Sequence, residues 1–315
     1  MQNSTLQHSI QSDLLQLFEQ FESINDGQLA SYIPELAKQN PAHFSISVMT
    51  VDGKKYSVGA ADHLLTLQSI SKPFVYGLAL EDIGREKMRR YVGVEQTAEA
   101  FNSIIELEEI SHRPYNPMVN SGAIAVSGLI AGENSAHKFQ RILEMFSQFC
   151  GRPVTMDESV FKSERSTADR NRAIAYLLKH FGKIDQDIEE TLDLYFQQCS
   201  ILMNTQDMAA MAATLANKGV NPQTHVKAFS SEYIKDLLSL MFTCGMYDSS
   251  GEWAYTVGIP AKSGVSGGII GVIPGVMGIA VTSPLLDEYG HSVRGSLVFK
   301  ELSQRWHLNL FEGVL

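Results

Sequence analysis

Residues 267–281 read GGIIGVIPGVMGIAV, and this stretch carries the clearest indication of the fold. Pro274 and Gly275 separate two short apolar runs, which is typical of two buried strands joined by a turn. The surrounding segment 263–286 has no charged residue and is long enough to span a bilayer. Its six glycines and its central turn favour buried strands over a membrane helix.

A second β region lies near the amino terminus. Phe44, Ile46 and Val48 alternate with polar residues, and Asp52-Gly53 is typical of a hairpin turn. We therefore expect two strands near residues 43–59, and a further strand over residues 253–257. Because an isolated hairpin is marginally stable in water, the two β regions should join in one antiparallel sheet of about five strands.

Helical patterns occupy both ends and the middle of the chain. The first helix should present one apolar face, formed by Leu6, Ile10, Leu14, Leu17, Phe18 and Phe21. Residues 70–242 are mostly helical in pattern, with expected helix ends at Gly84, Gly132, Gly151, Gly182 and Gly219. A closing helix should contain Leu297, Leu302, Trp306 and Leu310.

This order of elements predicts an α+β fold, because strands and helices do not alternate along the chain. We expect one domain with two lobes. A sheet lobe flanked by the terminal helices should comprise about 1–68 and 250–315, and an inserted all-helical lobe about 69–249. A cleft is expected at the seam between them.

Composition narrows the classes of function. The chain has 315 residues, of which 44% are hydrophobic and 19% charged, as in a soluble globular protein. Its net charge of −10 disfavours nucleic acids and anionic membranes as partners. Three distant cysteines and no CxxC pair favour a reducing, cytoplasmic location, and the absence of an apolar leader agrees with it.

Neither a metal nor a nucleotide cofactor is expected. The nine histidines show no ligand spacing such as HExxH, and no phosphate-binding loop of the GxxxxGK[ST] type is present. Two serine motifs remain. Gly264 to Gly268 match GxSxG around Ser266, but no helix pattern follows, so a glycine-rich strand is the better interpretation.

The other motif is S-x-x-K, in which the lysine lies one helical turn after the serine. Three matches occur, at Ser69/Lys72, Ser135/Lys138 and Ser159/Lys162. The last two pairs have polar neighbours and are interpreted as solvated surface. Ser69 follows an apolar run, so it should lie against the core at a helix amino terminus, where burial would lower the pKa of Lys72.

On the tetrapeptide alone, an N-cap serine with a surface lysine would be the simpler interpretation. Lys262-Ser263-Gly264 strengthens the catalytic one, because K-[ST]-G accompanies S-x-x-K in penicillin-interacting enzymes. A strand containing Lys262 should then border the cleft.

Several blocks in one order give a more specific resemblance. The blocks are Gln68–Pro73, Tyr115–Ile124, Ser163–Arg165 with Asp169–Asn171, Leu192–Phe196, Cys244–Asp248 and Pro260–Val265. Over roughly residues 26–313 the sequence resembles the serine-dependent glutaminase family, in a short bacterial form. The resemblance implies a β-lactamase/transpeptidase-like fold, hydrolysis of L-glutamine to L-glutamate and ammonia, no cofactor, and a homo-oligomer, either dimer or tetramer.

The resemblance also implies the roles of individual residues. Ser69 is the expected nucleophile, Lys72 its base, and Tyr247 or Lys72 the donor of a proton to ammonia. Substrate contacts are expected at Tyr32, Gln68, Ser69, Asn120, Glu164, Asn171, Tyr195, Tyr247 and Val265, and Lys262 should support them from behind. Each of Asn120, Glu164 and Tyr195 also has a structural interpretation, as an N-cap, a surface ion pair and a core residue, respectively.

Two other functions remain open at this point. The chain lacks a clean S-D-N motif between Ser69 and Lys262, so antibiotic hydrolysis is not expected. An esterase or peptidase on the same scaffold is the first alternative. The second is an inactive module that binds an amino acid, although the presence of both Ser69 and Lys72 argues against it.

Overall fold

The computed structural model describes residues 2–97 and 112–312, with side chains described from Ile10 onward. The expected helical pattern of residues 98–111 and the side chain of Leu6 therefore lie outside the described residues. One five-stranded antiparallel sheet forms, in the order β2-β1-β7-β6-β5. Its strands are β1 (Ser45–Thr50), β2 (Lys55–Gly59), β5 (Ala261–Gly264), β6 (Gly268–Ile273) and β7 (Met277–Thr282).

The amino-terminal hairpin joins the carboxy-terminal strands, as expected. Strand β1 pairs with β7, with Ile46 opposite Val281, and β6 pairs with β7 on the other side. The 24-residue uncharged segment is therefore strand, turn and strand. Among the described residues, no helix is both long and apolar enough to span a bilayer.

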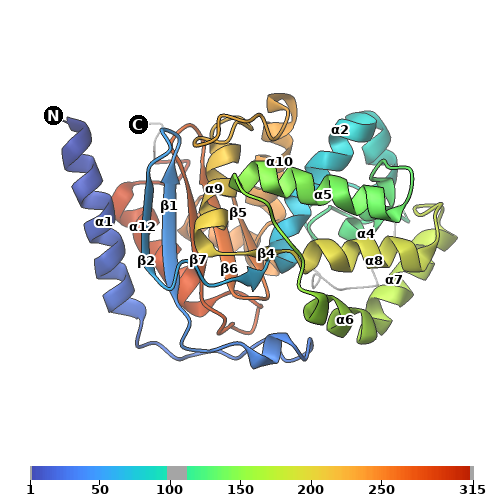
Figure 1. Ribbon diagram of the computed structural model, residues 1–315, viewed down its shortest axis with the longest axis horizontal. Helices are drawn as coiled ribbons and strands as arrows, with labels where there is room; N and C mark the ends of the chain where they lie inside the picture. Colours follow the sequence, from blue (N-terminus) through green and yellow to red (C-terminus); the bar gives the residue numbers. More distant parts are fainter. Residues whose placement is uncertain (1, 98–111, 313–315) are drawn as a thin grey trace.

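Helices cover both faces of the sheet (Figure 1). On one face, α1 (Gln2–Phe21) and α12 (Val293–Trp306) pack against alternate residues such as Ile279 and Val281. On the other, α9 (Thr205–Ala216) packs against Ala280. Gly278 permits this close approach, because a Cβ there would lie 2.1 Å from the backbone nitrogen of Ala213. Helix α9 belongs to the sequence range expected for the helical lobe, yet it packs on one face of the sheet.

Most of the other helices lie beside this sheet, on the right in Figure 1. These are α2 (Ser71–Tyr91), α4 (Asn120–Leu129), α5 (Ser135–Cys150), α6 (Glu158–Ser166), α7 (Asp169–His180) and α8 (Ile188–Cys199). Helix α10 (Ile234–Cys244) packs against α2, and α11 (Ser250–Thr256) contributes Trp253 to the apolar core between the sheet and α12. Two short strands, β3 (Leu65–Thr66) and β4 (Leu202–Met203), pair between the sheet and these helices.

The helix end expected at Gly84 is confirmed, because its φ of +73° and ψ of 164° are not helical and two helical segments of α2 meet there at a kink. The expected end of the closing helix is wrong. The closing helix ends at Trp306, because His307 has a left-handed φ of +51°, and Leu310 lies beyond it. Gly151 does cap α5 in the left-handed conformation, as expected.

The strand expected over residues 253–257 is also wrong, since this segment belongs mostly to helix α11. The buried members, Trp253 and Val257, are four residues apart, while Tyr255 is 89% exposed. A spacing of four places two side chains on one helical face, whereas a strand would have buried Tyr255 with them. The fifth strand is instead β5, which contains Lys262.

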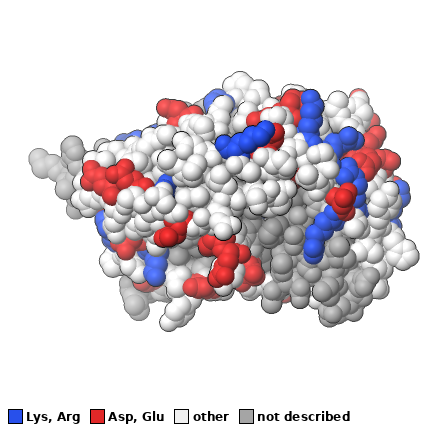
Figure 2. Space-filling model, turned by 90° about the horizontal axis from the view of Figure 1, so that it is seen from below, with Lys and Arg blue, Asp and Glu red and all other residues white. Residues whose placement is uncertain are grey.

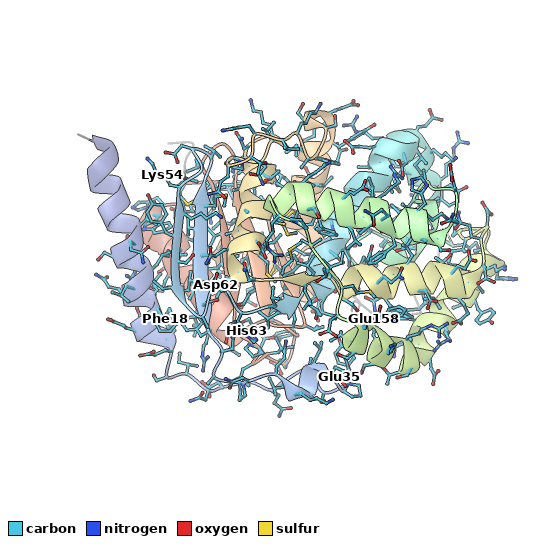
Figure 3. All side chains as sticks on the ribbon, viewed as in Figure 1. Phe18, Glu35, Lys54, Asp62, His63 and Glu158 are labelled. Atoms are coloured by element: carbon cyan, nitrogen blue, oxygen red, sulfur yellow. The ribbon has the colours of Figure 1, made fainter. Side chains whose placement is uncertain are left out.

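Charged side chains are mixed over the surface. On the face shown in Figure 2, Lys and Arg lie among Asp and Glu and form no continuous basic stripe. The segment after α1 runs along the lower edge of the molecule to α6 (Figure 1). There the backbone N–H of Glu35, labelled in Figure 3, donates to Ser163 Oγ at 3.4 Å.

Candidate active site

Ser69 lies where the sheet meets the helices. The β3–β4 pair leads into a 3₁₀ turn (Gln68–Ile70), and α2 begins immediately after it. The Leu67 N–H donates to the Ile201 carbonyl at 2.9 Å, which fixes the start of this turn. Ser69 is 8% exposed, so its hydroxyl is enclosed but not sealed from solvent.

Tyr247 meets Ser69 from the opposite side of the seam. It opens a 3₁₀ turn after α10, and its hydroxyl donates to the Ser263 carbonyl at 3.3 Å. Burial raises the pKa of Tyr247 to about 12, while the nearby side chain of Ser69 opposes this rise. Gly245 lets this turn reach β5, because a Cβ there would lie 1.8 Å from the Ala261 oxygen.

Backbone strain marks the same two turns. Gln68 has a φ of +50° and Tyr247 a φ of +49°. Residues other than glycine rarely adopt this left-handed conformation, which costs about 1–3 kcal/mol and persists only where the surroundings enforce it. The two strained residues are therefore Gln68, immediately before Ser69, and Tyr247, which lies close to Ser69.

Lys72 is held by α4 and the residues before it. Its Nζ donates to Asn120 Oδ1 at 2.7 Å and to the Met118 carbonyl at 3.2 Å. The lysine is 1% exposed, and burial lowers its pKa to about 8. Asn120 is the first residue of α4 and not its side-chain cap, so its amide is available to Lys72. Its Nδ2 donates to Asn171 Oδ1 at 3.2 Å, which brings α7 into the site.

Glu164 enters the site from α6. It is buried, so it is not the surface ion pair that its sequence neighbours allowed. Burial raises its pKa to about 8, while the charge of Lys72 and a hydrogen bond from Gln68 oppose this rise. Within the described part of the chain, its Oε2 is buried without a hydrogen-bond partner. An unpaired buried carboxylate oxygen is costly, and a positively charged ligand group would satisfy it.

Lys262 lies behind Tyr247. Its Nζ donates to the Ser263 carbonyl at 2.7 Å and lies 4.2 Å from the centroid of the Tyr247 ring. Burial, helped by the charge of Lys72, lowers its pKa well below the ordinary value. Strand β5 also borders the turn that carries Ser69, because a Cβ on Gly264 would lie 3.5 Å from the Ile70 nitrogen.

The remaining expected residues surround Glu164 and Val265. Burial raises the pKa of Tyr195 well above its ordinary value, and the charge of Glu164 contributes. Tyr32 as a whole is 55% exposed, but its hydroxyl end is enclosed. Burial of the hydroxyl raises its pKa well above the ordinary value, and the nearby Tyr247 and Glu164 raise it further. Val265 is buried in a small apolar cluster with Ala30, Ile33, Leu36 and Leu286. The segment that carries Tyr32 therefore packs on the end of β5.

Sequence reasoning missed two residues here. Cys199, at the end of α8, is a fully buried thiol hydrogen-bonded to Tyr195 and Ser71, and its charge interactions include Lys72 and Glu164. His291 stacks on the Tyr247 ring with the centroids 5.4 Å apart. Neither residue has a local motif, and only the assembled fold shows what they contact.

The competing serine motifs lie elsewhere or lack the required geometry. Ser266 is in the turn between β5 and β6, with no helix after it, so the nucleophile elbow is not formed. Lys138 donates to Gln186 Oε1 at 2.5 Å on the surface side of α5. Ser159 and Lys162 are both exposed.

Comparisons with known proteins agree with this arrangement. Residues 27–311 match the family model Glutaminase. A glutaminase of Trichormus variabilis is 60% identical over 95% of this chain and 89% of its own length. A solved structure of a probable glutaminase superposes with a TM-score of 0.94 at 43% identity, covering 96% of this chain and 98% of that one.

A second solved structure is a probable glutaminase from Bacillus subtilis complexed with 6-diazo-5-oxo-L-norleucine. It has a TM-score of 0.85 at 35% identity, and the match covers 95% of this chain and 94% of that one. Both the sequence and the fold thus match over nearly the whole length. The chain therefore belongs to the glutaminase family and is an amidohydrolase of that family.

Proposed function

We propose that this enzyme hydrolyses L-glutamine to L-glutamate and ammonia through a seryl ester on Ser69, with Lys72 as the general base. The observation that carries the proposal is the serine in the turn before α2, 8% exposed and three residues before a lysine that is 1% exposed. A serine hydroxyl is a weak nucleophile, so it requires a nearby base to accept its proton.

Lys72 suits the role of base because burial lowers its pKa to about 8. A useful fraction of the amine is then neutral near physiological pH, which is the condition for efficient proton transfer. In the first step, the Ser69 oxygen bonds to the δ-carbon of glutamine and its proton passes to Lys72. The backbone N–H groups of Ser69 and Val265 would hold the negative carbonyl oxygen, contributing about 3 kcal/mol per donor.

In the second step, the carbon–nitrogen bond breaks and ammonia leaves with one added proton. Lys72 can donate the proton that it took from Ser69. Alternatively, the Tyr247 hydroxyl, kept protonated by its pKa of about 12, donates and is then reprotonated by Lys72, so that Lys72 is neutral again by either route. Water then attacks the glutamyl ester and loses a proton to the base. The ester bond to Ser69 breaks, and glutamate and the free hydroxyl are restored.

Recognition of the amino-acid end follows from the remaining side chains. The unpaired Oε2 of Glu164 faces a buried site and would accept hydrogen bonds from the substrate's α-ammonium group. Asn120, Asn171, Tyr195 and Tyr32 supply neutral donors for the α-carboxylate and the side-chain amide. Gln68 supports Glu164, and Lys262 supports the Ser263 carbonyl through a hydrogen bond.

Covalent labelling tests the assignment of the nucleophile. Incubation with 6-diazo-5-oxo-L-norleucine, the compound in the Bacillus subtilis complex, should modify Ser69 stoichiometrically, and L-glutamine should protect it. Peptide mass spectrometry locates the adduct. An adduct on Ser266 or Ser71, or no adduct in an enzyme that releases ammonia from glutamine, would contradict the proposal.

Three broader expectations accompany this mechanism. We infer that the α+β architecture is of the β-lactamase/transpeptidase type, because S-x-x-K opens a helix and K-[ST]-G lies on the bordering strand. We expect a cytoplasmic enzyme that forms a homo-oligomer. Size-exclusion chromatography with light scattering would establish whether it is a dimer or a tetramer.

A further inference from the structure

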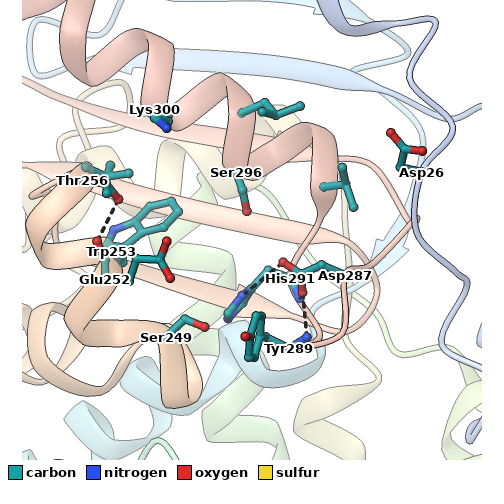
Figure 4. Close-up of a pocket in the computed structure, with 13 residues that line it drawn as sticks. Asp26, Ser249, Glu252, Trp253, Thr256, Asp287, Tyr289, His291, Ser296 and Lys300 are labelled. Atoms are coloured by element: carbon teal, nitrogen blue, oxygen red, sulfur yellow. Dashed lines mark hydrogen bonds and ion pairs between the residues drawn. The ribbon is translucent and has the colours of Figure 1, made fainter.

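The loop of residues 287–291 (Figure 4) packs against Tyr247, because the His291 ring stacks on the Tyr247 ring. Asp287 organises it, because its Oδ1 accepts hydrogen bonds from the backbone N–H of Tyr289 at 3.0 Å and of His291 at 2.9 Å. The Asp287 N–H in turn donates to the His291 carbonyl at 2.8 Å. The loop is thus closed on itself, and the position of His291 is fixed relative to Asp287.

The His291 side chain faces inward from this loop and is buried at 4% exposure. Its Nε2 lies 3.1 Å from the Met246 carbonyl oxygen. A carbonyl can only accept, so Nε2 carries the hydrogen in this contact. The other nitrogen, Nδ1, lies 3.7 Å from Asp287 Oδ2, so the carboxylate faces the remaining edge of the ring.

These contacts fall on the residue that precedes Tyr247 and on Tyr247 itself. The imidazole stacks on the Tyr247 ring, with an angle of 12° between the planes. The Met246 carbonyl accepts a second hydrogen bond from the Ser249 N–H at 3.0 Å. His291 therefore contacts both Met246 and Tyr247, at the point where the backbone adopts its left-handed conformation.

The strained conformation of Tyr247 requires contacts such as these two from His291. A bulky residue with a φ of +49° relaxes unless its neighbours enforce the conformation. Lys262 and the Ser263 carbonyl hold the distal part of the side chain, near the ring and hydroxyl. His291 is the group that holds both the ring and the preceding peptide.

We propose that His291, set in place by Asp287, is a positioning residue that directs the Tyr247 hydroxyl to Ser69. The inference rests on the proposed function, because it assigns His291 to the step in which Tyr247 exchanges a proton. In the described part of the chain, the polar and ring contacts of His291 are with Met246, Tyr247, Asp287 and Tyr289, and not with Ser69 or the residues expected to bind the substrate's amino-acid end. Its loss should therefore lower kcat and leave KM for glutamine nearly unchanged.

Three variants separate the two contacts of the imidazole. His291→Gln keeps an N–H donor near the position of Nε2 and removes the ring. His291→Phe keeps the stacked ring and removes the donor, and His291→Ala removes both. The matched control is Lys300→Gln, which lines the same cavity of about 470 Å³ at a position away from His291 (Figure 4).

We expect His291→Ala to lower kcat by about tenfold or more, up to the 10²–10⁴ that a general acid–base group contributes. His291→Gln should recover most of the loss, His291→Phe should recover less, and Lys300→Gln should match the wild type. Thermal unfolding of each variant measures its stability. A kcat that follows the order of melting temperatures, or that is unchanged in His291→Ala, would overturn the proposal.

A crystal structure of His291→Ala tests the same inference without any turnover. Tyr247 should leave its left-handed conformation, and its hydroxyl should move away from the Ser263 carbonyl. If Tyr247 keeps its position, the positioning role is refuted even if glutamine is a substrate. If the wild type releases no ammonia from glutamine while Tyr247 does move in the variant, the proposed function fails and the positioning role stands.

Discussion

The chain contains the same tetrapeptide pattern in two very different places, at Ser69/Lys72 and at Ser159/Lys162. Lys72 is 1% exposed, and its Nζ donates to Asn120 and the Met118 carbonyl. The side chain of Lys162 is 74% exposed and forms an ion pair with Glu158, one turn earlier, at 3.6 Å. Both regions therefore share the spacing of three residues, but only at Ser69/Lys72 is the lysine amine buried away from water.

This difference shows what turns the pattern into a site for chemistry. Desolvation disfavours the charged amine and lowers the pKa of Lys72 to about 8. A surface ion pair such as Lys162–Glu158 contributes little to stability and leaves the amine exposed to water. The two regions thus form a natural pair of experiment and control.

The largest contrast should come from the two serines. Ser69→Ala removes the nucleophile and should lower kcat by several orders of magnitude, as loss of a nucleophile does in other serine hydrolases. Ser159→Ala should retain full activity. Ammonia release from glutamine measures both variants, and circular dichroism checks that both are folded. Substantial activity in Ser69→Ala would remove the distinction between the two regions.

The two lysines should give the next largest contrast. Lys72→Met fills the same buried space without a base, and we expect kcat to fall by about 10²–10⁴. Lys162→Met should behave as the wild type. The rate of Ser69 labelling by 6-diazo-5-oxo-L-norleucine offers a second readout, because it isolates the attack by the serine. An unimpaired labelling rate in Lys72→Met would show that another group activates Ser69.

The sequence was a good guide to the fold wherever an apolar pattern had a single interpretation. Both hairpins and the first helix formed as predicted, since their alternation or three-to-four spacing determines which face is buried, and the closing helix formed but ends before Leu310. Residues 253–257 misled the prediction, because Trp253, Tyr255 and Val257 alternate as in a strand. Only packing, which buries the first and last and leaves Tyr255 in solvent, selects the helix.

The site was predictable to the extent that family motifs carry it. The residues expected from the resemblance lie around one seam, linked through Ser69, Lys72, Tyr247 and Glu164. The left-handed backbone of Gln68 and Tyr247 has no sequence signal, because neither is a glycine. Cys199 and His291 were missed for a similar reason, since their contacts join segments far apart in the sequence.

Glu164 extends the comparison from the base to the substrate pocket. Glu164→Gln keeps the shape and removes the negative charge that the α-ammonium group is expected to meet. A charge-assisted hydrogen bond contributes about 1.5–3 kcal/mol, so KM should rise by about 10–100-fold with a smaller change in kcat. The matched surface variant is Glu158→Gln, which should be silent. Steady-state kinetics with glutamine would exclude the ammonium role if KM did not change.

The pH dependence should follow the buried lysine. Protonated Lys72 cannot accept the serine proton, so kcat/KM should fall as pH drops below about 8. For one group the fall is about fivefold between pH 8 and pH 7, and protonation of Glu164, with its pKa of about 8, makes it steeper. Glu164→Gln should restore the shallower slope, and Lys162→Met should reproduce the wild-type profile. A flat profile between pH 6 and pH 8 would be inconsistent with a lysine base.

The smallest effect concerns the surface region alone. Asp157 caps α6, and its Oδ1 accepts from the N–H groups of Ser159 and Val160 at 2.8 and 3.1 Å. Asp157→Ala should lower the free energy of unfolding by about 1 kcal/mol and leave kcat unchanged. Denaturant titration and ammonia release measure the two quantities. A loss of activity without a loss of stability would give this region a role in chemistry after all.

A titration of Lys72 itself tests the central claim most directly. In a protein labelled with ¹³C at lysine Cε, the signal that disappears in Lys72→Met belongs to this side chain, and its shift can be followed from pH 6 to pH 11. The account predicts a midpoint near 8, because burial disfavours the charged amine. A midpoint near 10.4, the value of a solvated lysine, would contradict it.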